Sequence, residues 1–208
     1  MSDVRDSITA ELRQNEDGVN SKADQVIFLS GSSGAGKTTA VKTLSDSFVI
    51  ENRLLSDKNS SSVGLDCGKL KLSNNNDLLL YATYNQESSE TVLNALQDEV
   101  IGVVLLIDNR RKDPLRDLET LLIKLSAENT QPINVVTGVT HFDSSRTPAI
   151  SDYHSFILNQ GLFPDQNPPI FSVDARNYRD MCFLIEALLY TLDPSMPELL
   201  SEEKNLLS

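Results

Sequence analysis

The sequence predicts an α/β fold in which helices cover both faces of a mostly parallel, six-stranded sheet. Apolar runs of strand length alternate along the chain with segments whose leucines recur at helical spacing, which is the pattern of a parallel sheet with helical connections. One of these runs leads directly into a glycine-rich loop. The 208 residues, of which 39% are hydrophobic, provide the length and apolar content of a single domain.

The first strand leads into the most informative motif of the chain. An apolar run over 25–30 precedes the string GSSGAGKT at 31–38, and a helix is expected over 39–46. The string fits G-x-x-x-x-G-K-[ST], the phosphate-binding loop or Walker A motif. In that arrangement the N-terminus of the helix offers free N–H groups to an anion, and the glycines allow the main chain to approach phosphate closely. The motif therefore predicts a P-loop NTPase.

This loop supplies most of the candidate nucleotide-binding residues. We expect the Lys37 ammonium to reach the β- and γ-phosphates and to act in catalysis, while the Thr38 hydroxyl holds Mg²⁺. The N–H groups of the loop are expected to surround the phosphates. The candidate phosphate-binding residues are Gly31, Ser32, Ser33, Gly34, Ala35, Gly36, Lys37, Thr38 and Thr39.

The next elements form a predicted hairpin. Residues 52–62 are polar and rich in serine, and we expect a loop there. Residues 63–72 alternate loosely between apolar and polar side chains, as a half-buried strand does, and residues 78–83 form a second apolar run. The string NNND at 74–77 is typical of a turn. The two runs are therefore expected to pair as neighbouring strands.

Three further strands and two helices are expected in the second half of the chain. The continuous apolar run 100–108 is typical of a central parallel strand. Asp113 and Pro114 suit the N-cap and the first position of a helix. Strands are expected over 133–140 and 170–173, and a last helix follows. Ligands of such sheets bind at the carboxyl ends of the strands, so the loops after these strands are the expected site.

Charge and composition exclude several classes of function. The formal net charge is −12, which argues against nucleic acid or an anionic membrane as partner. Much of this charge lies in the acidic segments 1–24 and 193–208, which we expect to be flexible tails of one P-loop domain over 25–192. Cys67 and Cys182 lie far apart, so reduced buried thiols are expected. With no apolar run near the roughly 18 residues of a transmembrane segment, and no signal segment at the start, we expect a cytoplasmic protein.

Two short strings bear on the choice of base. The first follows a buried strand at 140–143 and resembles the guanine-reading [NT]-K-x-D motif. A carboxylate at its last position can accept hydrogen bonds from guanine N1–H and N2–H₂, whereas adenine offers no such pair of donors. The second string, at 174–176, resembles the [ST]-A-[KR] base loop. The candidate base-binding residues are Thr140, His141, Asp143, Asp174, Ala175 and Arg176.

Together these strings resemble a family of small bacterial GTPases, distant relatives of the Ras superfamily and of the polarity GTPases of gliding bacteria. The resemblance extends over about residues 25–190 and includes the strings DNRRxDP at 108–114 and GVTxxD at 138–143. It implies a Ras-like G domain that binds GTP and GDP with Mg²⁺. It also implies a surface controlled by the nucleotide and often a small Roadblock-type protein partner.

The chain departs from this family after the third expected strand. Ala82 occupies the position at which Ras-like proteins have an aspartate that supports Mg²⁺. Asn85 replaces a glycine whose N–H binds the γ-phosphate, although asparagine tolerates the left-handed conformation better than most residues. Gln86 stays in register to orient the attacking water and is the second candidate catalytic residue.

The metal and phosphate positions depart from the family as well. Ser62 is the best counterpart of the threonine that the first switch supplies to Mg²⁺. Asp66 either supports the metal through water in place of the missing aspartate or is a solvated acid of a strand. His141 replaces a lysine, and its ring either stacks along the phosphate loop or belongs to a surface loop.

The adjacent arginines Arg110 and Arg111 have two interpretations. One of them can place a cation near the phosphates, as an arginine finger does. The alternative is an ion pair with a neighbouring acid, for which the candidates are Asp108, Asp113 and Asp117.

Three functions are compatible with these patterns. The first is a small GTPase switch that hydrolyses GTP slowly or only with a partner. The second is a scaffold that retains the nucleotide with little or no turnover, which the changes at Ala82 and Asn85 favour. The third is an ATP-dependent small-molecule kinase, which needs several arginines in a lid. A guanine-reading role of Asp143 separates the first two from the third.

Overall fold

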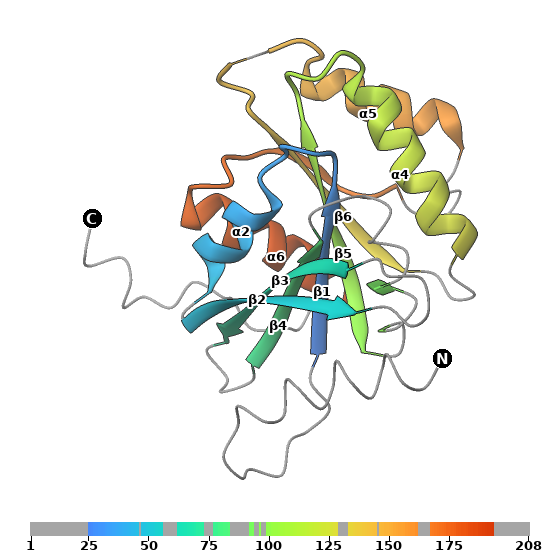
Figure 1. The fold of residues 1–208 in the computed structure, drawn as a ribbon. Coiled ribbons are helices and arrows are strands. Elements are labelled where there is room, and N and C mark those ends of the chain that lie inside the picture. Colours follow the sequence, from blue (N-terminus) through green and yellow to red (C-terminus); the bar gives the residue numbers. More distant parts are fainter. Residues whose placement is uncertain are drawn as a thin grey trace, which may run out of the picture.

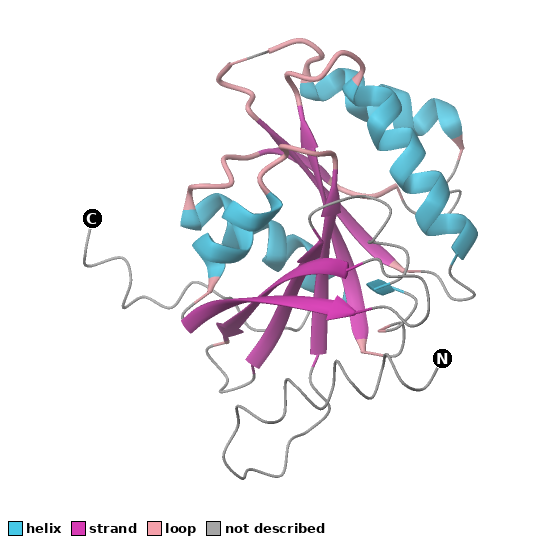
Figure 2. Cartoon of the chain, in the orientation of Figure 1, coloured by secondary structure: helices cyan, strands magenta, loops and turns pink. Residues whose placement is uncertain are grey.

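The computed structural model shows a seven-stranded sheet with helices on both of its faces (Figure 1), and Figure 2 shows the same layers by secondary structure. The strands are β1 (Gln25–Gly31), β2 (Ser47–Leu55), β3 (Ser62–Lys71), β4 (Asp77–Thr83), β5 (Val100–Asp108), β6 (Asn134–Thr140) and β7 (Ile170–Ser172). The helices are α2 (Lys37–Leu44), α4 (Pro114–Glu128), α5 (Ile150–Gln160) and α6 (Tyr178–Leu192). The structure describes residues 25–45, 47–55, 62–72, 77–83, 92–93, 96, 99–128, 133–144, 146–161 and 167–193.

The strand order places β1 near the middle of the sheet. The order is β2-β3-β4-β1-β5-β6-β7, and the five strands from β4 to β7 in this order are parallel. β3 runs antiparallel to both β2 and β4. The loop that follows β1 therefore starts between the carboxyl ends of β4 and β5, in the region where ligands of such sheets bind.

The α/β fold class and the predicted hairpin are confirmed, but the sheet has seven strands rather than six. β3 and β4 pair antiparallel, from Leu65 opposite Thr83 to Lys71 opposite Asp77. The additional strand is β2, which pairs along the outer edge of β3. The prediction of a loop from residue 52 onward is therefore wrong as far as Leu55, where β2 ends.

Two hydrophobic layers fill the space between the sheet and its helices. α4 and α5 cover one face, where Leu118, Leu122 and Ile157 are buried against strand residues such as Phe28. α2 and α6 cover the other face, and Val41 and Leu188 are among their buried residues. Strand residues alternate between the two layers, because successive side chains of a strand point to opposite faces.

α4 begins as the sequence predicts. Pro114 is its first residue, and the Asp113 carboxylate accepts a hydrogen bond from the Arg116 N–H at 3.1 Å. This is the capping contact that satisfies one of the N–H groups left without a partner at a helix start.

α5 is a helix that was not predicted from the sequence. The N–H of its N-cap residue, Ala149, donates to the Asp152 carboxylate in the first turn at 2.8 Å, so a main-chain donor at the start of the helix has a partner.

The expected tails lie outside the described residues, which run from residue 25 to residue 193. Within the described part of the chain, no helix has the length and apolar content needed to cross a membrane. Cys67 and Cys182 are both buried, and neither forms a disulfide, as expected from the sequence.

Candidate functional site

The phosphate-loop sequence forms a tight turn between β1 and α2, packed on the end of β5. The Ser32 N–H donates to the Leu106 carbonyl oxygen at 3.2 Å. A Cβ atom at Gly31 would lie 2.0 Å from that same oxygen, and Gly31 has a φ of 147°. A side chain at Gly31 is therefore excluded by backbone, which explains why the loop must open with glycine.

The first turn of α2 is open to an anion. Gly36 is the N-cap residue, with a φ of 94°, and it supplies no side chain that could cap the helix. The first intrahelical bond runs from the Ala40 N–H to the Gly36 carbonyl oxygen at 2.8 Å. No acidic residue occupies the first turn. The N–H groups of this turn thus point toward the loop without a side-chain acceptor at the N-cap, and helix N-termini of this kind bind anions.

Lys37 lies inside this loop. Its Nζ donates to the carbonyl oxygens of Gly31 at 3.0 Å and Ser32 at 3.1 Å, and only 6% of the residue is exposed. Burial lowers the pKa of the Lys37 ammonium, while the nearby Asp66 carboxylate acts in the opposite direction. The loop therefore holds a poorly solvated cation at its centre, where a negative ligand would gain most from it.

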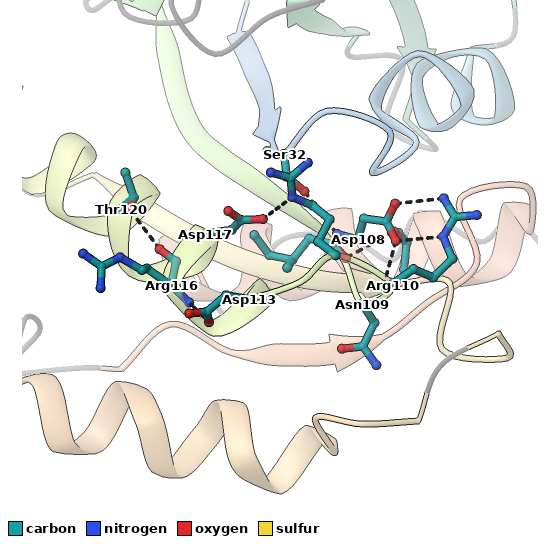
Figure 3. A network of polar contacts seen from close by, with 12 residues as sticks. Ser32, Asp108, Asn109, Arg110, Asp113, Arg116, Asp117 and Thr120 are labelled. Atoms are coloured by element: carbon teal, nitrogen blue, oxygen red, sulfur yellow. Dashed lines mark hydrogen bonds and ion pairs between the residues drawn. The ribbon is translucent and has the colours of Figure 1, made fainter.

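Asp108, the last residue of β5, joins the phosphate loop to Arg110 (Figure 3). The Asp108 N–H donates to the Ser32 hydroxyl oxygen at 3.2 Å. The Asp108 carboxylate accepts from Arg110 Nε at 3.0 Å and from a terminal guanidinium nitrogen at 2.8 Å. Burial opposes the ionisation of Asp108, but the hydrogen bonds from Arg110 outweigh it and lower the pKa of that carboxyl.

Arg111 also forms an ion pair, with Asp117 on α4. Both arginines are thus engaged by acids of the same loop and helix. Of the two interpretations of Arg110 and Arg111, the ion-pair interpretation is the one that the structure confirms.

The segment after β6 contacts the phosphate loop directly. The Thr140 hydroxyl lies 3.0 Å from the Ala35 carbonyl oxygen and 3.2 Å from that of Ile107. His141 follows with a φ of 58°, in the left-handed region, and its Nε2 lies 3.2 Å from the Gly34 carbonyl oxygen. A carbonyl oxygen only accepts, so this contact requires the proton on Nε2. His141 therefore contacts the loop and is not an isolated surface residue.

The segment after β7 is ordered by its own charges. Arg176 donates from Nε at 2.9 Å and from a terminal nitrogen at 2.7 Å to the Asp174 carboxylate, and these bonds lower the pKa of Asp174 to about 2. The Asp174 N–H donates to the Asp180 carboxylate of α6 at 2.8 Å. The Ala175 carbonyl oxygen accepts from the Thr43 hydroxyl of α2 at 2.8 Å. These contacts fix the segment beside the phosphate loop.

A cavity of about 360 Å³ lies where the three segments meet. Asp143 is an exposed residue of this cavity. Gly36 and Ala175 are packed closely there, because a Cβ atom at Gly36 would lie 2.8 Å from the Ala175 Cβ. Its lining combines the phosphate loop with the segments after β6 and β7, through Gly34, Gly36, Thr39, Thr140, His141, Phe142, Asp143, Ser172, Val173, Asp174, Ala175, Arg176 and Asp180. Segments more than 100 residues apart in the sequence thus form one concave site.

Comparison with known proteins identifies the fold through solved structures and not through sequence. No protein-family model matches the chain, and no curated protein matches it by sequence. Among solved structures, 1139 chains match. One of them is the G domain of the T. maritima FeoB iron transporter, with a TM-score of 0.58 and 14% identity, over 81% of this chain and 99% of that chain. The chain has the fold of a G domain.

Two residues that the sequence analysis assigned to the G-domain site are not placed by the structure. Gln86, the second candidate catalytic residue, lies outside the described residues. Ser62 is the first residue of β3, and only its main chain is described. Their roles stay predictions of the sequence.

Asn109 lies next to the site, beside Thr140, and was not among the residues predicted from the sequence. It is buried, its N–H donates to the Thr140 carbonyl oxygen at 3.1 Å, and its side chain accepts from the Tyr153 hydroxyl at 2.7 Å. Its amide group also donates to the Pro148 carbonyl oxygen at 3.2 Å. Asn109 thus ties the ends of β5 and β6 to α5. The only signal in the sequence is its place within the string at 108–114.

The residues beside the loop suit the Mg²⁺ that a G domain implies. Mg²⁺ is held in proteins by one or two oxygen side chains together with substrate phosphates and water. Thr38, half-buried in the first turn of α2, offers a hydroxyl, and Asp66 offers a carboxylate whose two oxygens have no hydrogen-bond partner among the described residues. Asp66 is only 1% exposed, so the interpretation as a solvated strand acid is wrong. Within the described part of the chain, no cluster of three or more His, Cys, Asp or Glu side chains is arranged to hold a metal.

Proposed function

We propose that this protein is a guanine-nucleotide-binding switch that binds GTP and GDP with Mg²⁺ and hydrolyses GTP slowly. The observation that carries the proposal is the cavity shared by the phosphate loop and the segments at 140–143 and 174–176. It has room for a nucleoside next to a loop built for phosphate, and both parts lie at the carboxyl ends of parallel strands. Lys37 and Thr38 then act on the phosphates and the metal.

The cavity favours guanine over adenine through Asp143. An exposed carboxylate at the cavity can accept from N1–H and N2–H₂ of guanine at the same time. Adenine has no donor at its N1 and no 2-amino group, so it would leave the carboxylate without a partner. A site built around a hydrogen-bonding partner discriminates strongly against a ligand that lacks it.

The kinase alternative loses support from the charges of the site. A kinase lid needs arginines that are available to the transferred phosphate. In the structure Arg110 is held by Asp108, Arg111 by Asp117 and Arg176 by Asp174. These three arginines are therefore engaged by neighbouring acids and are not available to a transferred phosphate.

The scaffold alternative keeps one specific observation in its favour. Ala82 is fully buried near the end of β4, at the position where Ras-like proteins have an aspartate, and a methyl group there can neither hold water nor support a metal. The rate of GTP hydrolysis separates the two functions, because a switch hydrolyses GTP slowly and a scaffold has little or no turnover. The Roadblock-type partner, a bacterial source and a cytoplasmic location stay predictions of the sequence.

Nucleotide binding tests the proposal directly. The nucleotide that co-purifies with the protein is identified by chromatography, and affinities for GDP, XDP and ADP are measured by calorimetry with Mg²⁺ present. We expect tight binding of GDP and weak binding of ADP. Asp143→Asn should weaken GDP and strengthen XDP, since xanthine carries a carbonyl oxygen where guanine carries the 2-amino group and an asparagine amide can donate to it.

Two variants control this experiment. Lys37→Ala should weaken all nucleotides alike, because it acts on the phosphates and not on the base. Glu119→Gln on α4, away from the cavity, should change nothing. Equal affinity of the protein for GDP and ADP, unaltered by Asp143→Asn, would refute guanine recognition.

Hydrolysis is measured separately in a single-turnover assay. G domains of this kind hydrolyse GTP on the order of 10⁻⁴ s⁻¹ without a partner. A rate of this order in the protein, with a lower rate in Lys37→Ala, supports the switch. A rate equal to that of the variant would support the scaffold alternative instead.

A further inference from the structure

Asp66 is a buried carboxylate that the fold does not satisfy. It is 1% exposed, and neither of its oxygens has a hydrogen-bond partner among the described residues. A charged group without a partner in the interior is costly, and proteins retain such groups mainly where a ligand or a function uses them.

The position of Asp66 in the sheet brings it to the phosphate loop. In the register of β3 and β4 it lies directly opposite Ala82, next to the pair of Leu65 with Thr83 at the carboxyl end of β4. Ala82 in turn lies opposite Leu29 of β1, two residues before the loop begins at Gly31. Asp66 is therefore near the edge of the sheet where the phosphate loop starts.

The side chain of Asp66 lies on the face that α2 covers. Its neighbours Leu65 and Cys67 belong to the layer under α4 and α5, so Asp66 points to the opposite face. Gly68, two residues further along that face, touches α2, since a Cβ atom there would lie 2.8 Å from Val41 Cγ1. One helical turn before Val41 is Lys37, which places the first turn of α2 over Asp66.

Electrostatics agree with this placement. The Asp66 carboxylate raises the pKa of the Lys37 ammonium, against the effect of burial. The two groups are thus close enough to interact, although no hydrogen bond joins them, because the Lys37 ammonium donates to the carbonyl oxygens of its own loop.

We propose that Asp66 supports the Mg²⁺ held at Thr38, and that this function has moved from β4 to its cross-strand partner on β3. The proposal rests on the proposed function, because the metal arrives with a nucleoside di- or triphosphate. The Asp66 carboxylate accepts hydrogen bonds from the water that Mg²⁺ retains, and this satisfies the two oxygens that the fold leaves without partners.

The pairing of Asp66 with Ala82 explains the change at β4. Residues directly opposite each other on one face of an antiparallel pair have neighbouring Cβ atoms, and like charges there repel. One carboxylate can therefore serve from either strand, but two would conflict. An alanine at residue 82 is the counterpart of an aspartate at residue 66.

The test measures how Mg²⁺ controls the release of a fluorescent GDP analogue (mant-GDP), from chelator to millimolar Mg²⁺. In the wild-type protein Mg²⁺ is expected to slow release. In Asp66→Asn the Mg²⁺ concentration that gives half of this effect should rise by roughly 10- to 100-fold, as is usual when a residue behind the metal ligands is lost. Without Mg²⁺ the release rate should stay close to that of the wild-type protein.

A charge relocation gives the proposal a positive control. The double variant Asp66→Asn/Ala82→Asp places the carboxylate back on β4 and should recover most of the Mg²⁺ sensitivity. Glu119→Gln should behave as the wild-type protein does. Thermal unfolding of the nucleotide-free proteins is a second readout, which shows that each variant is folded before release rates are compared.

Three results would overturn the proposal. Tight mant-GDP binding with the same Mg²⁺ dependence in Asp66→Asn and the wild-type protein would show that Asp66 has no part in the metal site. Faster release by the same factor with and without Mg²⁺ would make Asp66 only a charge partner of Lys37. Absence of any mant-GDP binding to the wild-type protein would end the proposed function as well, and it is recognised before any variant is compared.

Discussion

The hydroxyl of Thr140, at the end of β6, lies 3.0 Å from the carbonyl oxygen of Ala35 in the phosphate loop, and 105 residues separate the two in sequence. The same hydroxyl lies 3.2 Å from the Ile107 carbonyl oxygen of β5. Thr140 is 2% exposed, so both acceptors lie in the interior. This one side chain joins the segment after β6 to the loop before α2.

Thr140→Val should therefore destabilise the protein without changing its volume much. The variant removes the one O–H donor that these two buried carbonyl oxygens share, which costs about 1–3 kcal/mol of the free energy of unfolding. Denaturation in urea measures this change. We also expect weaker GDP binding, since the segment that carries Asp143 then has one contact fewer with the phosphate loop, and only that of His141 remains among the described residues.

The same strand offers a matched control for this prediction. Thr137 is fully buried on β6, but its hydroxyl oxygen has no hydrogen-bond partner among the described residues. Thr137→Val removes a polar group that the fold does not satisfy, so it should be neutral or stabilising. Equal destabilisation by the two variants would show that Thr140 acts through packing alone.

His141 gives a second prediction. Its Nε2 donates a hydrogen bond to the Gly34 carbonyl oxygen and so helps to hold the phosphate loop in place. His141→Ala should weaken GDP binding by roughly 2- to 12-fold, which corresponds to one hydrogen bond of about 0.5–1.5 kcal/mol. Calorimetry measures the affinity.

A lysine at residue 141 is the informative comparison. His141→Lys restores the residue of the resembled family and keeps a donor for the Gly34 carbonyl oxygen. It should bind GDP at least as well as the wild-type protein. Loss of affinity in His141→Lys as large as in His141→Ala would mean that the imidazole ring, and not its hydrogen bond, matters.

The sequence predicted the parts of this site whose pattern is local. The phosphate loop is a contiguous string, and its flanking strand and helix follow from residues within ten positions of it. The hairpin of β3 and β4 was predictable for the same reason, because two apolar runs flank a turn of asparagines.

β2 and α5 were not predicted because their own patterns are weak. β2 has the sequence SFVIENRLL, in which Glu51, Asn52 and Arg53 interrupt the apolar residues, so these neither alternate with polar residues nor form an unbroken run. α5 buries only Tyr153 and Ile157, and two positions are too few to establish a helical period.

The burial of Asp66 illustrates a different limit. Alternation along β3 tells which residues share its face, but not which face a helix covers. That depends on α2, which precedes β3 by more than 15 residues in the chain. A property that arises from the packing of two distant elements is absent from the local sequence of either one.

A third prediction compares two ion pairs of the same geometry and different burial. Arg110 donates with two nitrogens to Asp108, and Arg176 does the same to Asp174. The Asp108 side chain is 7% exposed, whereas the Asp174 side chain is 44% exposed. Arg110→Gln should lower the melting temperature more than Arg176→Gln, because a buried carboxylate loses more when its partner is removed.

Salt distinguishes the two pairs further. The effect of Arg176→Gln should shrink when the ionic strength is raised, since solvent-exposed charges are screened. The effect of Arg110→Gln should change less with salt, because the Asp108 side chain is only 7% exposed and buried charges are screened less. Two variants with the same melting temperature at all salt concentrations would contradict the role of burial here.

The last prediction concerns the pH dependence of the Arg176 ion pair. Hydrogen bonds from Arg176 lower the pKa of Asp174 from 3.8 to about 2. Because the pKa of the folded state lies below the ordinary value, the pair stabilises the fold fully above that value, and this stabilisation is lost as pH falls through about 2. In Arg176→Gln the pKa of Asp174 should return toward 3.8. The difference in unfolding free energy between wild-type protein and variant should therefore be present at neutral pH and vanish toward pH 2.

An NMR titration of the Asp174 carboxyl measures the pKa, and urea denaturation at several pH values measures the unfolding free energy, with Arg179→Gln on α6 as the control. If the pKa of Asp174 stays low in Arg176→Gln, the backbone N–H groups around it, and not the guanidinium, stabilise its charge.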